Sequence, residues 1–304
     1  MLRTKPIALS TMWGIGRFDN LATMVEKSHE LGFTHIEVNY QVTETMLEEL
    51  RSVPHLAVSS VHCPCPGRQL SDGRWTYRLR MTAEEEDEWQ PALQGALDTV
   101  DTAVALGASV MVLHVGSVPL EDGLEPKLRD MYKKGEFRRP EYCDLRERLL
   151  AQREARKAPY LDAAYERVRR LVDRAGEHGI RVGLESRYYF HEIPNLEEMA
   201  LFMEEFGDSV GYWHDVGHAE NLERLGFTPH IDWLKTLGHR MIGVHLHDIS
   251  TLADHEAPGK GDLNLRAIAP YVPDEAIRVC ELTSGNSEED IRAGLAVLRQ
   301  AGLI

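Results

Sequence analysis

Residues 243–248 read Gly243-Val244-His245-Leu246-His247-Asp248, and this stretch decides the fold that we predict. It follows the apolar pair Met241-Ile242, and its own apolar residues alternate with histidines, which is the period-2 pattern of a β-strand. The polar residues gather at the end of the run. We therefore predict a strand whose chemically active side chains lie at its carboxyl end.

The same profile recurs along the chain. Five other apolar runs end at residue types that bind metals or move protons, namely His62, His114, Glu185, Asp215 and Glu281. Helical patterns separate the runs, and we count eight strand–helix units. Strict alternation favours a parallel sheet of the α/β class, and eight repeats favour a closed (β/α)8 TIM barrel. A doubly wound open sheet is the alternative, although no G-x-G-x-x-G motif follows the first strand.

The spacing of four strand-end residues is regular. Glu185 and Asp215 are 30 residues apart, as are Asp215 and His245, and Glu281 follows His245 by 36 residues. A βα unit takes roughly 30 residues or more, so the four residues occupy equivalent places and converge on the axis of a barrel. Carboxylates with one imidazole suit Mn²⁺, Mg²⁺, Co²⁺ or Zn²⁺. We predict that these four residues bind a divalent metal.

Each of these residues taken alone also has an ordinary explanation. A single histidine at a strand end is usually a hydrogen-bonded structural residue, and an acidic residue after a strand is often a helix cap. Six strand ends in succession rarely carry such residues by chance, because charged side chains are seldom buried without a partner.

Composition limits the classes of protein that fit. The chain has 304 residues and a net charge of −15, and this acidic balance argues against nucleic acid as a partner. Nothing approaches the ~18 apolar residues of a membrane span, and residues 1–6 lack the apolar core of a signal peptide. We expect a cytoplasmic protein. Four unevenly spaced cysteines indicate free thiols, although Cys63 or Cys65 could lend a thiolate to a metal.

One connection interrupts the regular alternation. We predict a single domain over residues 1–304, with an extended connection after the fourth strand at about 118–159 and a helix from about Leu161 to His178. A connection this long is usually a lid or an oligomer contact, so a homo-oligomer stays open. Earlier in the chain, Thr82 stands three residues before Glu85, which predicts a capping box at the start of a helix.

At this point the motifs resemble a known group of enzymes. The chain is similar to the xylose-isomerase-like TIM barrels of the sugar phosphate isomerase/epimerase family, which are related to ketose 3-epimerases, inosose dehydratase and endonuclease IV. The resemblance covers nearly the whole chain. Its motifs are Leu184-Glu185-Ser186-Arg187, His214-Asp215-Val216-Gly217-His218, Val244-His245-Leu246-His247-Asp248, Pro258-Gly259-Lys260-Gly261 and Val279-Cys280-Glu281.

The resemblance also implies roles for individual residues. It places the metal ligands at Glu185, Asp215, His245 and Glu281, and it makes the two glutamates a catalytic acid–base pair. It implies that His218 contacts substrate or binds an additional zinc. Residues expected to contact the substrate or to wall its pocket are Arg187, Glu192, Trp13 and Glu37.

The endonuclease pattern is present in part. His62, His114 and His255 match its further zinc-binding histidines, but Ala253 stands where that pattern has an aspartate. Asp254 is displaced by one position. This departure leaves a third metal site open.

Three functions compete at the level of the sequence. The first is a metal-dependent isomerase or epimerase that acts on a sugar, cyclitol or related polyol by proton transfer alpha to a carbonyl, through a metal-stabilised enediolate. The second is a zinc-dependent phosphodiesterase or a dehydratase in the same site. The third is a barrel that binds a metal and a sugar without catalysis, which would not require paired acid–base groups.

Overall fold

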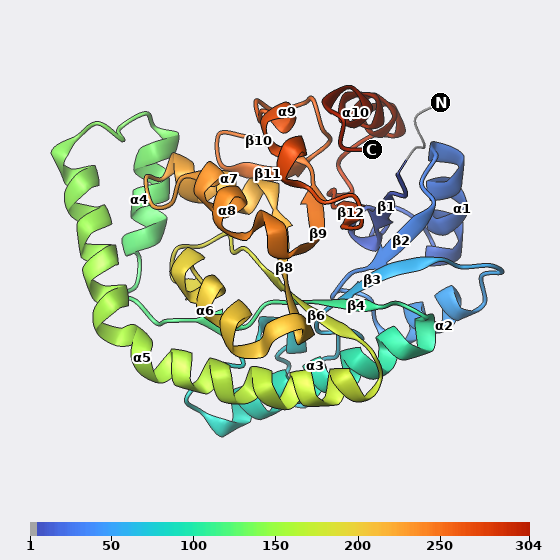
Figure 1. The fold of residues 1–304 in the computed structure, drawn as a ribbon, viewed down its shortest axis with the longest axis horizontal. Coiled ribbons are helices and arrows are strands. Elements are labelled where there is room, and N and C mark those ends of the chain that lie inside the picture. Colours follow the sequence, from blue (N-terminus) through green and yellow to red (C-terminus); the bar gives the residue numbers. More distant parts are fainter. Residues whose placement is uncertain (1–4) are drawn as a thin grey trace.

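Eight parallel strands close into a barrel in the computed structural model, which describes residues 5–304 (Figure 1). Their order around the barrel is β1-β12-β9-β8-β6-β4-β3-β2. The (β/α)8 prediction is confirmed, and the open sheet is excluded. The strands are β1 (Ala8–Ser10), β2 (His35–Val38), β3 (Val58–His62), β4 (Val110–Leu113), β6 (Arg181–Glu185), β8 (Val210–Asp215), β9 (Met241–Leu246) and β12 (Ile277–Cys280).

Helices surround this barrel (Figure 1). No helix among residues 5–304 is long and apolar enough to cross a membrane, and the segment used for the signal-peptide prediction lies mostly outside the described residues. The helices are α1 (Leu21–Leu31), α2 (Glu44–Arg51), α3 (Glu86–Leu106), α4 (Leu124–Lys133), α5 (Pro140–Glu177), α6 (Leu196–Phe206), α7 (Val216–Arg224), α8 (His230–Leu237), α9 (Leu265–Ile268) and α10 (Glu288–Ala301).

The segment that interrupts the alternation is mostly helical. It contains α4 and the first half of α5, and α5 continues along the edge of the molecule towards α3 (Figure 1). The predicted start of this helix near Leu161 is therefore wrong. The helix begins at Pro140. Proline suits this first position, because an N–H in the first helical turn has no partner within the helix and because the fixed φ of proline is close to the helical value.

The predicted capping box before α3 is also wrong. The residue that precedes this helix is Glu85, and its side chain makes no cap. Thr82 is buried, and its hydroxyl bonds instead to the backbone of Ser117, 3.0 Å from the carbonyl oxygen and 2.9 Å from the nitrogen. The contact between Thr82 and Ser117 therefore forms in place of the capping box that the local sequence predicts.

Two short antiparallel ribbons follow the carboxyl ends of the barrel strands. One pairs β5 (Gly116–Ser117) with β7 (Glu192–Ile193), and the other pairs β10 (Asp248–Ser250) with β11 (Ala253–Glu256). They bring the loops after β4, β6 and β9 over one end of the barrel. Asp248 ties the second ribbon down, since its carboxylate accepts hydrogen bonds from the backbone of Ile249, Gly259 and Leu263.

Trp213 fills the barrel interior beneath this end. It is fully buried, and its ring centroid lies 5.2 Å from that of His245. Glycines on the neighbouring strands make room for the indole. A Cβ at Gly243 would lie 2.1 Å from a ring carbon of Trp213, and a Cβ at Gly183 would lie 3.0 Å from another.

We expect Gly243→Ala to destabilise the protein by about 1–3 kcal/mol or more, because the new methyl overlaps a ring that has no space to move. Denaturant unfolding would measure the loss. Gly176→Ala is the control, because a Cβ at this helical glycine meets no atom within 4 Å. Equal stability of the two variants would contradict the packing described here.

Candidate metal centre

Four strand ends bring the predicted metal ligands together. One ligand atom from each of Glu185, Asp215, His245 and Glu281 lies within 4.8 Å of the others, and all four residues are buried. His245 Nδ1 lies 2.8 Å from Glu185 Oε1, 3.2 Å from Glu281 Oε2 and 3.5 Å from Asp215 Oδ2. Asp215 is also the cap of α7, since its Oδ1 accepts a hydrogen bond from the backbone N–H of His218.

The other nitrogen of His245 faces Glu37. The distances from Nε2 to the two carboxylate oxygens are 3.1 and 3.2 Å, and Ser60 donates a hydrogen bond to the same carboxylate. Glu37 is fully buried. It therefore lies behind the ligand group and not in the pocket wall where the sequence placed it. A carboxylate in this position fixes the orientation of a metal-binding imidazole.

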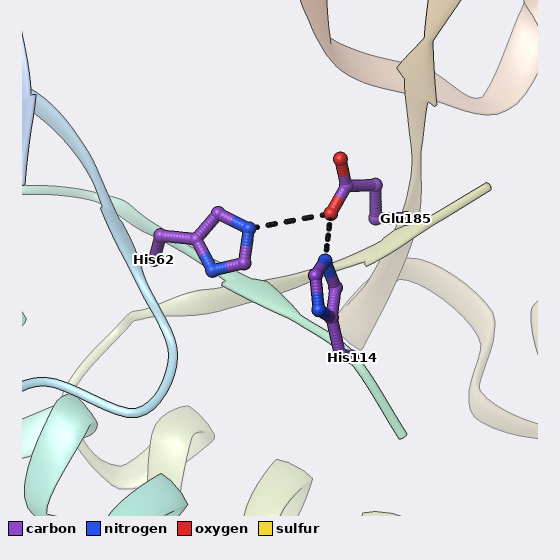
Figure 2. A group of neighbouring side chains, drawn as sticks. All are labelled: His62, His114 and Glu185. Atoms are coloured by element: carbon purple, nitrogen blue, oxygen red, sulfur yellow. Dashed lines mark hydrogen bonds and ion pairs between the residues drawn. The ribbon is translucent and has the colours of Figure 1, made fainter. Parts of the chain in front are cut away.

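A second group of donors adjoins the first at Glu185. Figure 2 shows His62 and His114 pointing at the same carboxylate oxygen, Oε2. The Nε2 of His62 is 3.3 Å from it. Nδ1 of His62 lies 3.1 Å from the carbonyl oxygen of Cys63 and donates to it. Burial would lower the pKa of His62, but Glu185 outweighs it and raises this pKa, so an ion that binds Nε2 must displace a proton. Glu185 thus belongs to both groups.

A third group lies on the other side of the first. Ligand atoms of His218, Asp254 and His255 come within 4.8 Å of one another, and His255 Nε2 is 3.3 Å from Glu281. Neighbouring strand residues normally point to opposite faces. His255 has a φ of +60°, a left-handed conformation, and this break in the alternation lets both Asp254 and His255 reach His218. The displaced aspartate therefore does not prevent a third donor group.

His247 supports this arrangement from behind. Its Nδ1 accepts a hydrogen bond of 3.0 Å from the backbone N–H of His255. Its Nε2 must then carry the proton, which it shares with Asp215 at 3.1 Å from each carboxylate oxygen. His247 therefore acts as a donor to Asp215 and not as a metal ligand.

The charges of the group suit a cation. Burial alone would raise the pKa of Glu281, but His245 and His255 outweigh it and lower this pKa to about 2. Burial and the charge of Arg187 lower the pKa of His114 to about 3, so its ring is neutral at pH 7. Burial would lower the pKa of His245, but Glu281 and Glu37 raise it well above its usual value. An ion that binds Nδ1 must therefore displace a proton.

A cavity of about 400 Å³ opens above the ligands. Asp215 and His245 lie beneath it. Trp13 is not part of its wall, because the indole is fully buried and donates a hydrogen bond of 2.8 Å to the carbonyl of Asn286. The expected site residues that line the cavity are His62, His114, Glu185, Arg187, His218, His255 and Glu281.

Arg187 is held between two carboxylates. Its Nη2 lies 2.6 Å from Glu192 Oε1, and its Nη1 lies 3.4 Å from Glu185 Oε2. Glu192 thus orients Arg187 and lines a neighbouring cavity.

Comparison with known proteins identifies the family of this chain. A family model described as "Xylose isomerase-like TIM barrel" matches residues 25–301. The chain belongs to this family. A search of curated proteins finds no match.

Several solved structures share the fold of this xylose isomerase-like chain. The TTHB071 protein of Thermus thermophilus, soaked with ZnCl2, is 20% identical, with 97% of each chain covered and a TM-score of 0.58. The 3-keto-D-glucoside 4-epimerase YcjR of E. coli is 15% identical, with 98% of this chain and 100% of that chain covered and a TM-score of 0.67. A D-psicose 3-epimerase solved in the presence of D-fructose is 15% identical, with 98% and 100% covered and a TM-score of 0.65.

Three aromatic residues of this xylose isomerase-like site were not predicted from the sequence, namely Tyr40, Tyr188 and Tyr189, which line the metal cavity. Tyr188 and Tyr189 line the metal cavity, with ring centroids 4.7 Å apart. The guanidinium carbon of Arg129, on α4, lies 4.0 and 5.0 Å from the two ring centroids. Two tyrosines after a strand do not by themselves indicate a binding site, and Arg129, which packs on them, is distant in the sequence.

Glu125, also on α4, holds the same loop. Its carboxylate accepts hydrogen bonds from the backbone N–H groups of Phe190, at 2.9 Å, and His191, at 3.4 Å. We expect Glu125→Gln to cost about 1 kcal/mol, because one half-buried N–H loses its acceptor, and to speed amide exchange in residues 188–192. Hydrogen exchange would measure both effects. Glu121→Gln, at an exposed ion pair, should change neither; equal protection in both variants would argue against this contact.

Proposed function

We propose that this chain is a divalent-metal-dependent isomerase or epimerase that acts on a sugar, cyclitol or related polyol. One observation carries the proposal. Two buried glutamates, Glu185 on β6 and Glu281 after β12, flank a single histidine nitrogen and both line the cavity. A reaction that removes a proton from the substrate and then returns one needs a base and an acid close together, and these two carboxylates can take those roles.

The donor set fits a divalent ion. Glu185, Asp215, His245 and Glu281 provide three carboxylates and one imidazole, and the buried carboxyls have pKa values below their usual range. Oxygen ligands with one nitrogen suit Mn²⁺, Mg²⁺, Co²⁺ and Zn²⁺. When bound, such an ion would polarise a substrate carbonyl and offset the negative charge that develops on its oxygen.

The protein's own groups would move the proton. Glu281 is the better placed base, because its Oε1 has one partner, the side-chain amide of Asn39 at 3.3 Å. Oε2 of Glu185 is shared by His62, His114 and Arg187. In this proposal Glu281 removes the proton alpha to the carbonyl and later releases it to solvent. Glu185 returns a proton that it takes from the ring of His62, whose pKa this carboxylate raises and whose Nε2 lies 3.3 Å from its Oε2. Arg187 orients the substrate oxygens.

Exchange with solvent tests the proposal. We would incubate the metal-loaded protein with ketoses and inososes in D2O and follow deuterium at the carbon next to the carbonyl by NMR. Incorporation into one class of substrate would support proton transfer and would identify that class. The absence of exchange in all of them, together with cleavage of a phosphodiester, would refute the proposal.

The two further donor groups favour a second candidate. His62 and His114 adjoin the four ligands on one side, and His218, Asp254 and His255 adjoin them on the other. Such a set could hold two more ions, as a zinc-dependent phosphodiesterase would require. The net charge of −15 argues against a nucleic acid substrate, so this candidate concerns a small phosphodiester. A dehydratase would use the same carboxylates, and a barrel that only binds its ligand would show no exchange.

A further inference from the structure

A second cavity adjoins the metal centre. It has a volume of about 340 Å³ and shares the side chains of Tyr40, His114 and Arg187 with the metal cavity. Its outer wall comes from the loop between β3 and α3. Any ligand that fills both cavities must pass these three shared residues.

The second cavity lacks the carboxylates that line the first. Its wall contains two arginines, Arg78 and Arg187, and none of the described residues that line it is acidic. The adjoining metal cavity contains Glu185, Asp254 and Glu281. An acid-free cavity is notable in a chain with a net charge of −15, and it would attract the negatively charged part of a ligand.

Several hydrogen-bond donors that line this cavity have no acceptor among residues 5–304. Within residues 5–304, no hydrogen bond involves the hydroxyls of Tyr40 and Tyr77, the side-chain amide of Gln41 or the guanidinium of Arg78. Tyr40, Gln41 and Tyr77 are half-buried and Arg78 is exposed, so their donors are free to meet a ligand. The Nε of Arg187 is buried and also lacks a partner. Buried donors are normally satisfied, so an acceptor oxygen of a ligand would satisfy this one.

A row of aromatic rings in contact holds the two tyrosines in place. The ring centroids of Trp75 and Tyr77 are 5.4 Å apart, those of Tyr77 and Tyr40 are 5.6 Å apart, and those of Tyr40 and His62 are 5.2 Å apart. The row of rings runs from the outer loop to a histidine of the metal centre. The positions of the donors are therefore coupled to that centre.

We propose that the second cavity binds the anionic end of the substrate, a phosphate or a carboxylate, through Arg78 and the hydroxyls of Tyr40 and Tyr77, while the other end of the substrate reaches the metal centre. Arg187 lies at the junction and contacts both parts. The inference rests on the proposed function for the identity of the reacting end. It assigns the substrate to the acidic derivatives of sugars or polyols.

Binding of simple anions tests this assignment without a known substrate. We would titrate the protein, as purified with its metal, with inorganic phosphate and with acetate by calorimetry, and repeat this with Arg78→Gln and with Arg266→Gln, an exposed arginine on α9. Charge-assisted hydrogen bonds are strong, so we expect Arg78→Gln to weaken binding about tenfold or more and Arg266→Gln to leave it unchanged. Tyr77→Phe should give a smaller loss.

Each outcome has a definite meaning. Preference for phosphate or for acetate, lost in Arg78→Gln, identifies the anion. Failure of the wild type to bind either anion, or equal binding by the two arginine variants, overturns the inference, because an anion held by the metal alone would not depend on Arg78. Proton exchange on a neutral ketose with no effect of Arg78→Gln would leave the proposed function standing and remove this inference alone.

Discussion

Replacing Glu281 with glutamine is expected to lower turnover by about 10²–10⁴-fold, the usual contribution of a general acid or base. Glutamine has nearly the same size as glutamate, but its amide does not take up a proton at the pH of the assay. Its amide also places an N–H₂ group near His245 or His255, which lie 3.2 and 3.3 Å from Glu281 Oε2. The measurement is the rate of deuterium exchange into a substrate of the wild-type protein, compared at equal metal content.

Metal content decides how this result is interpreted. If Glu281→Gln keeps its ion and loses exchange, the carboxylate moves the proton. If the variant loses both the ion and the exchange activity, Glu281 is at least a metal ligand. The exchange rate of the variant at saturating metal then shows whether Glu281 also moves the proton. Glu289→Gln, at an exposed position on α10, should behave as wild type. Full turnover by Glu281→Gln would rule out the acid–base assignment.

The positions of the candidate metal ligands could be predicted because strand geometry is periodic. Residues that end parallel strands must meet at one end of a closed barrel, so the spacing of Glu185, Asp215 and His245 in the sequence predicts that they lie together. The same reasoning placed His62 and His114 nearby. These predictions depend only on the fold.

Other parts of the site depend on contacts that a sequence pattern does not contain. Glu185 is the last residue of β6, but Glu37 lies one residue before the end of β2, and its side chain lies behind His245. Asp254 and His255 act together only because His255 adopts a positive φ. The loop with Tyr188 is fixed by Arg129, 59 residues earlier in the sequence. These side-chain positions are determined by packing between segments that are distant in the sequence, so the local pattern of residues does not predict them.

Replacing Glu185 with glutamine is expected to remove metal from two of the three donor groups at once. Oε1 of Glu185 faces His245, and Oε2 faces His62 and His114, so the change weakens both sets. The His218, Asp254 and His255 group does not contain Glu185 and should be retained. Elemental mass spectrometry of protein purified without chelator would count ions per chain. Glu204→Gln, an exposed glutamate on α6, is the control.

Thermal unfolding provides an independent measurement of the same centre. An ion at 100 times its dissociation constant stabilises the folded state by about 2.7 kcal/mol, which for a chain of 304 residues corresponds to a rise in Tm of roughly 4 °C. We expect a chelator to lower the Tm of wild type by this amount and to have a smaller effect on Glu185→Gln. Removal of metal should also abolish deuterium exchange.

The number of ions then separates the two proposed chemistries. One ion per chain, absent from Glu185→Gln, would favour the isomerase or epimerase and would leave His62 and His114 free to contact substrate. Two or three zinc ions per chain would make those histidines ligands and would favour phosphodiester hydrolysis, because the additional ions would occupy the space around Glu185 that a polyol would need. A Glu185→Gln variant with unchanged metal content and unchanged Tm would show that this carboxylate binds no ion, and both proposals would then fail together.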